Sequence, residues 1–200
     1  MAISSEVIEA ARRVGTAAGV APAVLLAVSI VETDGRAFAR VGDRNEPLIR
    51  FEGHYFDRLL AGDARRIART AGLAHPRAGA VRNPVSQPAR WALLSRAASI
   101  DADAAYASTS WGLAQVMGSH WRALGYEGPL GLARTARASA DGQFDIAARF
   151  LSLGGLHRLL ERGEAAGFAR RYNGPAFARN RYDTKIAAAL ITARRLLAGS

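Results

Sequence analysis

Apolar residues recur every three or four positions along most of the chain, the spacing that places them on one face of an α-helix. The pattern predicts a first helix over residues 5–18, capped by Ser5. A second, almost wholly apolar helix is expected from Pro22, which suits a first turn, to Thr33. Further helices are predicted over residues 89–105, 109–118, 139–152, 156–162, 164–172 and 183–198.

One short segment has the pattern of a strand. Residues 48–52, Leu-Ile-Arg-Phe-Glu, lie between Pro47 and Gly53, and we expect a small hairpin or extended segment there. Residues 72–88 carry several glycines and prolines and predict a loop. The fold class predicted from the whole pattern is mainly α, in one compact unit.

Composition fits such a domain and excludes some chemistry. The 200 residues, half of them hydrophobic, suit one domain with a substantial core. There is no cysteine, which excludes disulfides, a cysteine nucleophile and a thiolate metal site. The four histidines, His54, His75, His120 and His157, show no close ligand spacing, so we expect neither a metal site nor a cofactor.

The chain is strongly basic, with a formal net charge of +10 and Lys185 as its only lysine. Such a charge favours polyanionic partners: nucleic acid, anionic lipid or an acidic cell envelope. The arginines are spread along the chain without a recognised nucleic-acid motif, so no nucleic acid is expected. Residues 183–200 are apolar on one side and basic on the other, which suits either a packed terminal helix or contact with an anionic membrane.

No targeting segment is evident. No apolar stretch is long enough to span a membrane, and the N-terminus has acidic residues where a signal peptide is basic. We expect synthesis in the cytoplasm, so action outside it would need holin-type, secretion-system or lytic release.

Glu32 is the strongest candidate for chemistry. It follows an apolar stripe of Val24, Leu25, Val28 and Val31 and emerges at the C-terminal end of the predicted helix. Desolvation and the negative end of the helix dipole should both raise the pKa of this carboxyl. A carboxyl that stays protonated near neutral pH can act as a general acid. The alternative is a solvated glutamate at a helix end.

Two titratable residues follow in the strand candidate. On an extended chain Glu52 and His54 point to the same side, whereas Phe51 and Tyr55 point to the other. Such a pair could flank a cleft. The alternative is a solvent-facing strand surface.

Two further stretches carry uncharged polar groups. In Ser-Trp-Gly-Leu-Ala-Gln-Val-Met-Gly, residues 110–118, Gln115 stands in an apolar run and is either a satisfied core group or part of a cleft. Tyr172 and Asn173 precede Gly-Pro in a predicted turn, where a phenol and an amide suit neutral polyhydroxylated ligands. The alternative there is a plain helix terminator.

Taken together, four stretches resemble the N-acetylmuramidase family of phage endolysins and related bacterial proteins, in the goose-type and lytic-transglycosylase branch of the lysozyme superfamily. They are VETDGRAF (31–38), IRFEGHYF (49–56), SWGLAQVMG (110–118) and FARRYNGPAFARNRYDTKIA (168–187). The resemblance extends over essentially the whole chain. It implies a lysozyme-like α-helical fold with a small hairpin or extended segment, and residues 1–200 as a single catalytic domain without a separate wall-binding module.

The activity that the resemblance implies is cleavage of peptidoglycan between N-acetylmuramic acid and N-acetylglucosamine. Glu32 takes the general-acid position, and Glu52 is the expected second carboxylate, ahead of Asp43 or Asp34. The substrate-binding residues expected are His54, Ser110, Gln115, Tyr172 and Asn173, with the hydroxyl of Tyr172 holding Glu32. A lytic transglycosylase or a non-catalytic basic envelope-binding protein is the alternative. We expect a monomer that binds peptidoglycan and, through its basic surface, anionic wall or outer-membrane polymers.

The sequence departs from the family pattern at two places. Gly53 stands between Glu52 and His54, where an arginine is usual, so the charge beside Glu52 differs. Thr33 and Asp34 follow Glu32, where a serine-containing step is commoner.

Overall fold

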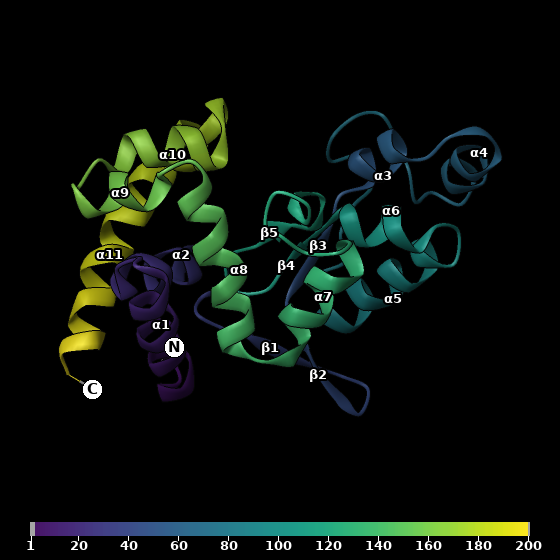
Figure 1. Ribbon diagram of the computed structural model, residues 1–200. Helices are drawn as coiled ribbons and strands as arrows, with labels where there is room; N and C mark the ends of the chain where they lie inside the picture. The colour runs from purple at the N-terminus through teal and green to yellow at the C-terminus, as the bar shows by residue number, and fades with distance from the viewer. Residues whose placement is uncertain (1–2, 200) are drawn as a thin grey trace.

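A computed structural model describes residues 3–199 (Figure 1), apart from the side chains of residues 175 and 176. The helices are α1 Ser5–Ala18, α2 Pro22–Thr33, α3 Gly53–Leu59, α4 Gly62–Thr70, α5 Gln87–Ala98, α6 Ala102–Ala107, α7 Pro129–Ala138, α8 Ala140–Leu153, α9 Leu156–Glu161, α10 Ala165–Asn173 and α11 Tyr182–Ala198. The strands are β1 Phe38–Val41, β2 Arg44–Pro47, β3 Ile49–Phe51, β4 Thr109–Trp111 and β5 Val116–Met117, and the 3-10 turns are η1 Gly118–His120 and η2 Pro175–Asn180.

The elements form two lobes on either side of α8 (Figure 1). The helical lobe, on the left, contains α1, α2 and α9–α11, and α2 packs against both α1 and α11. The sheet lobe, on the right, contains the strands and α3–α7. Helix α8 contacts α1 and α9 of one lobe and α7 and β5 of the other, so it ties the lobes together. The mainly α fold predicted from the sequence is confirmed.

Two small antiparallel sheets support the sheet lobe. Strands β1 and β2 form a hairpin, with Phe38 opposite Pro47. Strand β4 lies between β3 and β5, with Arg50 opposite Ser110 and Ser110 opposite Met117. Along β3 the side chains of Ile49 and Phe51 are buried and that of Arg50 is exposed, so one face of the strand packs on the core.

The helix predicted over residues 109–118 is wrong, because this stretch is the β4–β5 hairpin. Gly112 and Gln115, in the turn between the strands, have φ values of 63° and 46°. The right-handed helix does not allow these values. The apolar run reflects a strand pair buried on both faces, which periodicity cannot distinguish from a buried helix.

Other boundaries differ for local reasons. Ser4, not Ser5, caps α1 by accepting a hydrogen bond from the Val7 amide at 3.4 Å. The helix predicted over residues 89–105 is two helices, α5 and α6, and Asp101 caps the second. Helices α3, α4 and α7 were not predicted; they have only seven, nine and ten residues, too few turns for their apolar spacing to stand out.

The C-terminal segment is a packed helix. Helix α11 buries Tyr182, Ile186, Ala189, Leu190 and Ala193, and α2 is its main neighbour. The apolar side that could have contacted a membrane is therefore inside the protein. Within residues 3–199, no helix is both long and apolar enough to cross a bilayer.

Candidate active site

A polar cleft of about 570 Å³ lies between the two lobes. The helical lobe contributes the ends of α2 and α10 together with η2, and the sheet lobe contributes β3, β4, the β4–β5 turn and α5. The lining residues are Glu32, Arg50, Glu52, Arg90, Ser110, Gln115, Tyr172, Asn173 and Asn180. Six of the seven site residues expected from the sequence are among them, and His54 is not.

Glu32 lies at the last turn of α2, above the buried side chains of Val24, Leu25 and Val28. The hydroxyl of Tyr182, at the start of α11, donates a hydrogen bond of 2.5 Å to its Oε1. Burial raises the pKa of Glu32, in the direction expected from the sequence, whereas the Tyr182 hydrogen bond and the charge of Arg50 lower it. The result is a carboxyl that holds its proton to higher pH than a solvated glutamate.

The tyrosine that holds Glu32 is not the one expected. The hydroxyl of Tyr172 donates to the carbonyl oxygen of Ala114 at 2.6 Å, so it ties α10 to the β4–β5 turn. Tyr172 also stacks on Tyr182, with ring centroids 6.0 Å apart. Tyr172 therefore supports the residue that contacts Glu32. Tyr182 lies 150 positions from Glu32, and no local pattern in the sequence joins them.

The step after Glu32 fixes the end of α2 on the sheet lobe. The buried hydroxyl of Thr33 lies 3.0 Å from the Ser29 carbonyl oxygen and 3.3 Å from that of Leu113, in the β4–β5 turn. Asp34 ends the helix in a left-handed conformation, with φ of 53°. The departure from the serine-containing step thus keeps a hydroxyl where α2 meets the hairpin.

Gln115 is both a cleft residue and a satisfied polar group. Its Nε2 donates to the carbonyl oxygens of Leu48 at 3.1 Å and Gly112 at 2.8 Å, across the turn that it helps to form. The fully buried amide nearby belongs to Gln143, whose Oε1 accepts from the Leu113 amide at 2.9 Å. A Cβ at Gly112 would lie 2.7 Å from Gln143 Cγ, so glycine permits the close approach.

We therefore expect Gln115→Leu to destabilise the protein. The change removes the donor for two carbonyl oxygens and keeps an unfavourable positive φ, which should cost roughly 1–3 kcal/mol. For a domain of this size each kcal/mol lowers the melting temperature by about 2–4 °C, which calorimetry can measure. Gln115→Gly is the control, because it removes the amide but relieves the backbone. A stable Gln115→Leu protein with impaired turnover would instead assign the amide to the substrate.

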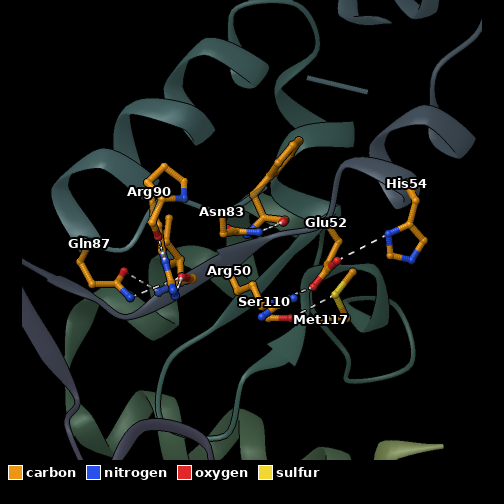
Figure 2. A network of polar contacts seen from close by, with 11 residues as sticks. Arg50, Glu52, His54, Asn83, Gln87, Arg90, Ser110 and Met117 are labelled. Carbon is orange, nitrogen blue, oxygen red and sulfur yellow. Dashed lines mark hydrogen bonds and ion pairs between the residues drawn. The ribbon is translucent and has the colours of Figure 1, made fainter. Parts of the chain in front are cut away.

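Glu52 faces the cleft from the sheet lobe, as the N-cap of α3 rather than as a strand residue. Arg50 Nε donates to its Oε1 at 2.7 Å, and His54 Nδ1 lies 3.5 Å from its Oε2 (Figure 2). The side chain of Glu52 is 19% exposed and that of Arg50 is 55% exposed, so water screens this ion pair mainly from the Arg50 side. His54 is on α3 and outside the lining, so it contacts Glu52 rather than the open cleft.

Gly53 has a packing reason to replace arginine. A Cβ there would lie 2.4 Å from Val81 Cγ2 and 3.0 Å from the carbonyl oxygen of Leu73. The first turn of α3 thus packs directly on the loop between α4 and α5, and no side chain fits. Arg50 still supplies a cation against Glu52.

That loop and α5 hold the second edge of β3 in place (Figure 2). Asn83 Oδ1 accepts from the Phe51 amide at 2.9 Å, and its Nδ2 donates to the Phe51 carbonyl oxygen at 2.7 Å. Gln87 Oε1 accepts from the Ile49 amide at 3.0 Å, and Arg90 Nη1 donates to the Ile49 carbonyl oxygen at 3.1 Å. These side chains replace a further strand and fix the position of Arg50 and Glu52.

The two aspartates weighed as alternatives to Glu52 lie elsewhere. The Asp43 side chain is fully exposed in the β1–β2 turn, 3.7 Å from Arg40. Asp34 is exposed at the end of α2 and is outside the cleft lining. Over residues 3–199, no group of three or more histidine, aspartate or glutamate side chains is placed to hold a metal ion.

Comparison with known proteins identifies the family of the chain. The N-acetylmuramidase family model matches residues 21–194. No curated protein matches the chain. The fold is similar to the crystal structure of the Burkholderia AP3 phage endolysin, with a TM-score of 0.77 and 30% identity, over 94% of this chain and 71% of that one. The chain therefore belongs to the N-acetylmuramidase family and is a peptidoglycan-degrading glycoside hydrolase of the lysozyme type.

Proposed function

We propose that Glu32 is the general acid of a muramidase that cleaves the β-1,4 bond between N-acetylmuramic acid and N-acetylglucosamine. The observation that carries the proposal is a partly buried carboxyl, with its pKa raised, at the wall of a polar cleft. Its proton would go to the leaving glycosidic oxygen. The Tyr182 hydroxyl would fix which carboxyl oxygen faces the bond.

Glu52 is proposed as the second carboxylate. Arg50 Nε donates a hydrogen bond to its Oε1, and Glu52 lines the cleft from the sheet lobe, whereas Glu32 lines it from the helical lobe. An ionised carboxylate there would either activate water or attack the sugar. A second carboxylate in the cleft favours water over an internal hydroxyl as the final acceptor, and so favours hydrolysis over lytic transglycosylation.

The uncharged lining residues suit the sugars. Ser110, Asn173 and Asn180 present hydroxyl and amide groups along the cleft, which can bond the hydroxyls and acetamido groups of a glycan strand. Tyr172 adds an aromatic ring to the lining. The strand would lie across the cleft between the lobes.

The basic surface is proposed to bring the enzyme to the wall. A net charge of +10 attracts peptidoglycan stems and other anionic envelope polymers and raises the rate of encounter.

Borohydride reduction of the products tests the bond specificity. Cleavage after N-acetylmuramic acid gives products that reduce to muramitol, whereas cleavage after N-acetylglucosamine gives glucosaminitol. A lytic transglycosylase gives anhydro ends that do not reduce and that weigh one water less. Muramitol alone is expected, and either other product would contradict the proposal.

The proposal also predicts the effect of Tyr182→Phe. Losing the hydroxyl removes a hydrogen bond that favours the carboxylate, so the pKa of Glu32 should rise further. Because a general acid works protonated, the alkaline limb of the kcat/KM profile should move to higher pH. Looser orientation of the carboxyl should lower kcat by roughly ten- to a hundredfold.

Tyr172→Phe is the matched control for this change. Its hydroxyl bonds the Ala114 carbonyl oxygen and not Glu32, so the alkaline limb should stay in place. A limb that moves with Tyr172→Phe but not with Tyr182→Phe would reverse the assignment of the two tyrosines.

A further inference from the structure

Arg90 is a cation in the cleft wall, and neither Glu32 nor Glu52 forms an ion pair with it. Its Nε donates to the Pro84 carbonyl oxygen at 2.8 Å and its Nη1 to that of Ile49 at 3.1 Å. These neutral carbonyl groups fix the guanidinium but do not balance its charge. Within residues 3–199, no carboxylate forms an ion pair with Arg90, and the charge that acts on it is that of Arg50, which has the same sign.

The charges of the lining leave this cation unbalanced. In the protonated form that general acid catalysis requires, Glu32 is neutral, and the charges of Glu52 and Arg50 offset each other. The remaining charged group of the lining is Arg90. Burial and Arg50 both lower the pKa of Arg90, yet an arginine remains charged at neutral pH. A cation that is partly desolvated and faces a like charge is favourable for an incoming anion.

A glycan strand of peptidoglycan carries its anions at one kind of position. Its hydroxyls and acetamido groups are neutral, and every carboxylate lies either on the 3-O-lactyl substituent of N-acetylmuramic acid or on the peptide stem attached to it. In a strand with peptide stems the carboxylates are on the stem, and in a strand without stems the lactyl group itself is the carboxylate.

We propose that Arg90 binds a carboxylate of the lactyl substituent or of the stem attached to it, and thereby selects muramoyl residues for the cleft. The inference rests on the proposed function, because it takes the same cleft as the site of cleavage. Arg90 is held by the loop before α5 and by β3, so its position does not depend on Glu32 (Figure 2). It acts as a specificity determinant and not as an acid or base.

Matched pairs of soluble glycan strands test this assignment. One pair keeps the peptide stems, with amino groups acetylated, and is compared before and after its carboxylates are converted to methylamides. The other pair is stripped of stems by an amidase, and its lactyl carboxylates are compared with their methylamides. Conversion should lower kcat/KM of the native enzyme by about tenfold in at least one pair, mainly through KM. The pair that responds identifies the stem or the lactyl group as the source of the carboxylate.

Arg90→Gln completes a double-mutant cycle with the substrate. The substitution should lower kcat/KM about tenfold on the responding carboxylate strand, and the two changes together should cost no more than either alone. Arg90→Lys keeps the charge and should retain part of the preference for carboxylate strands over methylamide strands. It replaces Arg90→Gln in the cycle if that variant does not fold. Arg82→Gln removes the same charge from an exposed side chain outside the lining, and should preserve the preference.

Equal turnover of the carboxylate and methylamide strands in both pairs would overturn the inference. So would an Arg90→Gln loss of the same size on all strands, which would reduce Arg90 to a support for β3. Neither result depends on the acid. If Glu32→Gln stays active, the proposed function fails, while the carboxylate and methylamide strands still report on the role of Arg90. If Glu32→Gln is inactive and the native enzyme cleaves both strands of each pair equally, only the proposed role of Arg90 is refuted.

Discussion

Turnover of purified murein by a Glu32→Gln protein is expected to fall by roughly 10²–10⁴-fold, the range typical of a positioned general acid. The amide has the shape of the carboxyl and can still accept the hydrogen bond of Tyr182, but it has no proton to give to the leaving oxygen. Loss of turbidity of a murein suspension measures the rate, per mole of folded enzyme.

Stability provides the control for this variant. The folded-state pKa of Glu32 lies above its unfolded value, so the stability that this group contributes is present at low pH and is lost as pH rises through the folded pKa. An amide does not ionise, so above that pH Glu32→Gln should be at least as stable as the native protein. Near-native lysis by the folded variant would remove Glu32 from the mechanism.

Glu52→Gln is expected to lower turnover by about 10²-fold, the lower end of the range for a positioned acid or base. The amide cannot activate water or attack the sugar, and it weakens the contact with Arg50, which lies at 2.7 Å in the native protein. The same turbidity assay applies, and binding to murein measured by sedimentation separates lost catalysis from lost affinity.

Asp43→Asn is the matched control, since it removes one carboxylate from a fully exposed turn outside the cleft. Substitutions at such surface positions usually change stability little. Because Asp43 is also outside the cleft, turnover should stay within about twofold of the native value. If Glu52→Gln kept most of its activity while Asp34→Asn or Asp43→Asn lost it, the role of second carboxylate would pass to that aspartate.

The long helices were predictable because each buries one face. Helices α1 and α2 begin and end within one residue of the expected positions, since their apolar spacing and Pro22 are local signals. The β4–β5 hairpin was not predictable in the same way. Strand β3, which pairs with β4, and Gln143, which meets Gly112 and the Leu113 amide, lie far away in the sequence, and the positive φ of Gln115 belongs to the turn between the strands.

The site was predictable where a residue marks the end of an element. Glu32 and Tyr172 lie in the last turns of α2 and α10, and both line the cleft. Arg50, Arg90 and Asn180 were missed. In a chain with 27 basic residues, no local pattern separates a cleft arginine from a surface one. Tyr182 was missed because its contact with Glu32 depends on how α11 packs against α2.

Titration of Glu32 tests the account most directly. In protein carrying ¹³C at the glutamate side-chain carboxyls, the resonance that disappears in Glu32→Gln identifies Glu32, and its shift against pH gives the pKa. The account expects this pKa to lie above the ordinary value for glutamate and to coincide with the alkaline limb of kcat/KM, because that limb reports the essential acid of the free enzyme. A Glu32 that titrates at or below the ordinary value, or well away from that limb, would contradict its role as the acid.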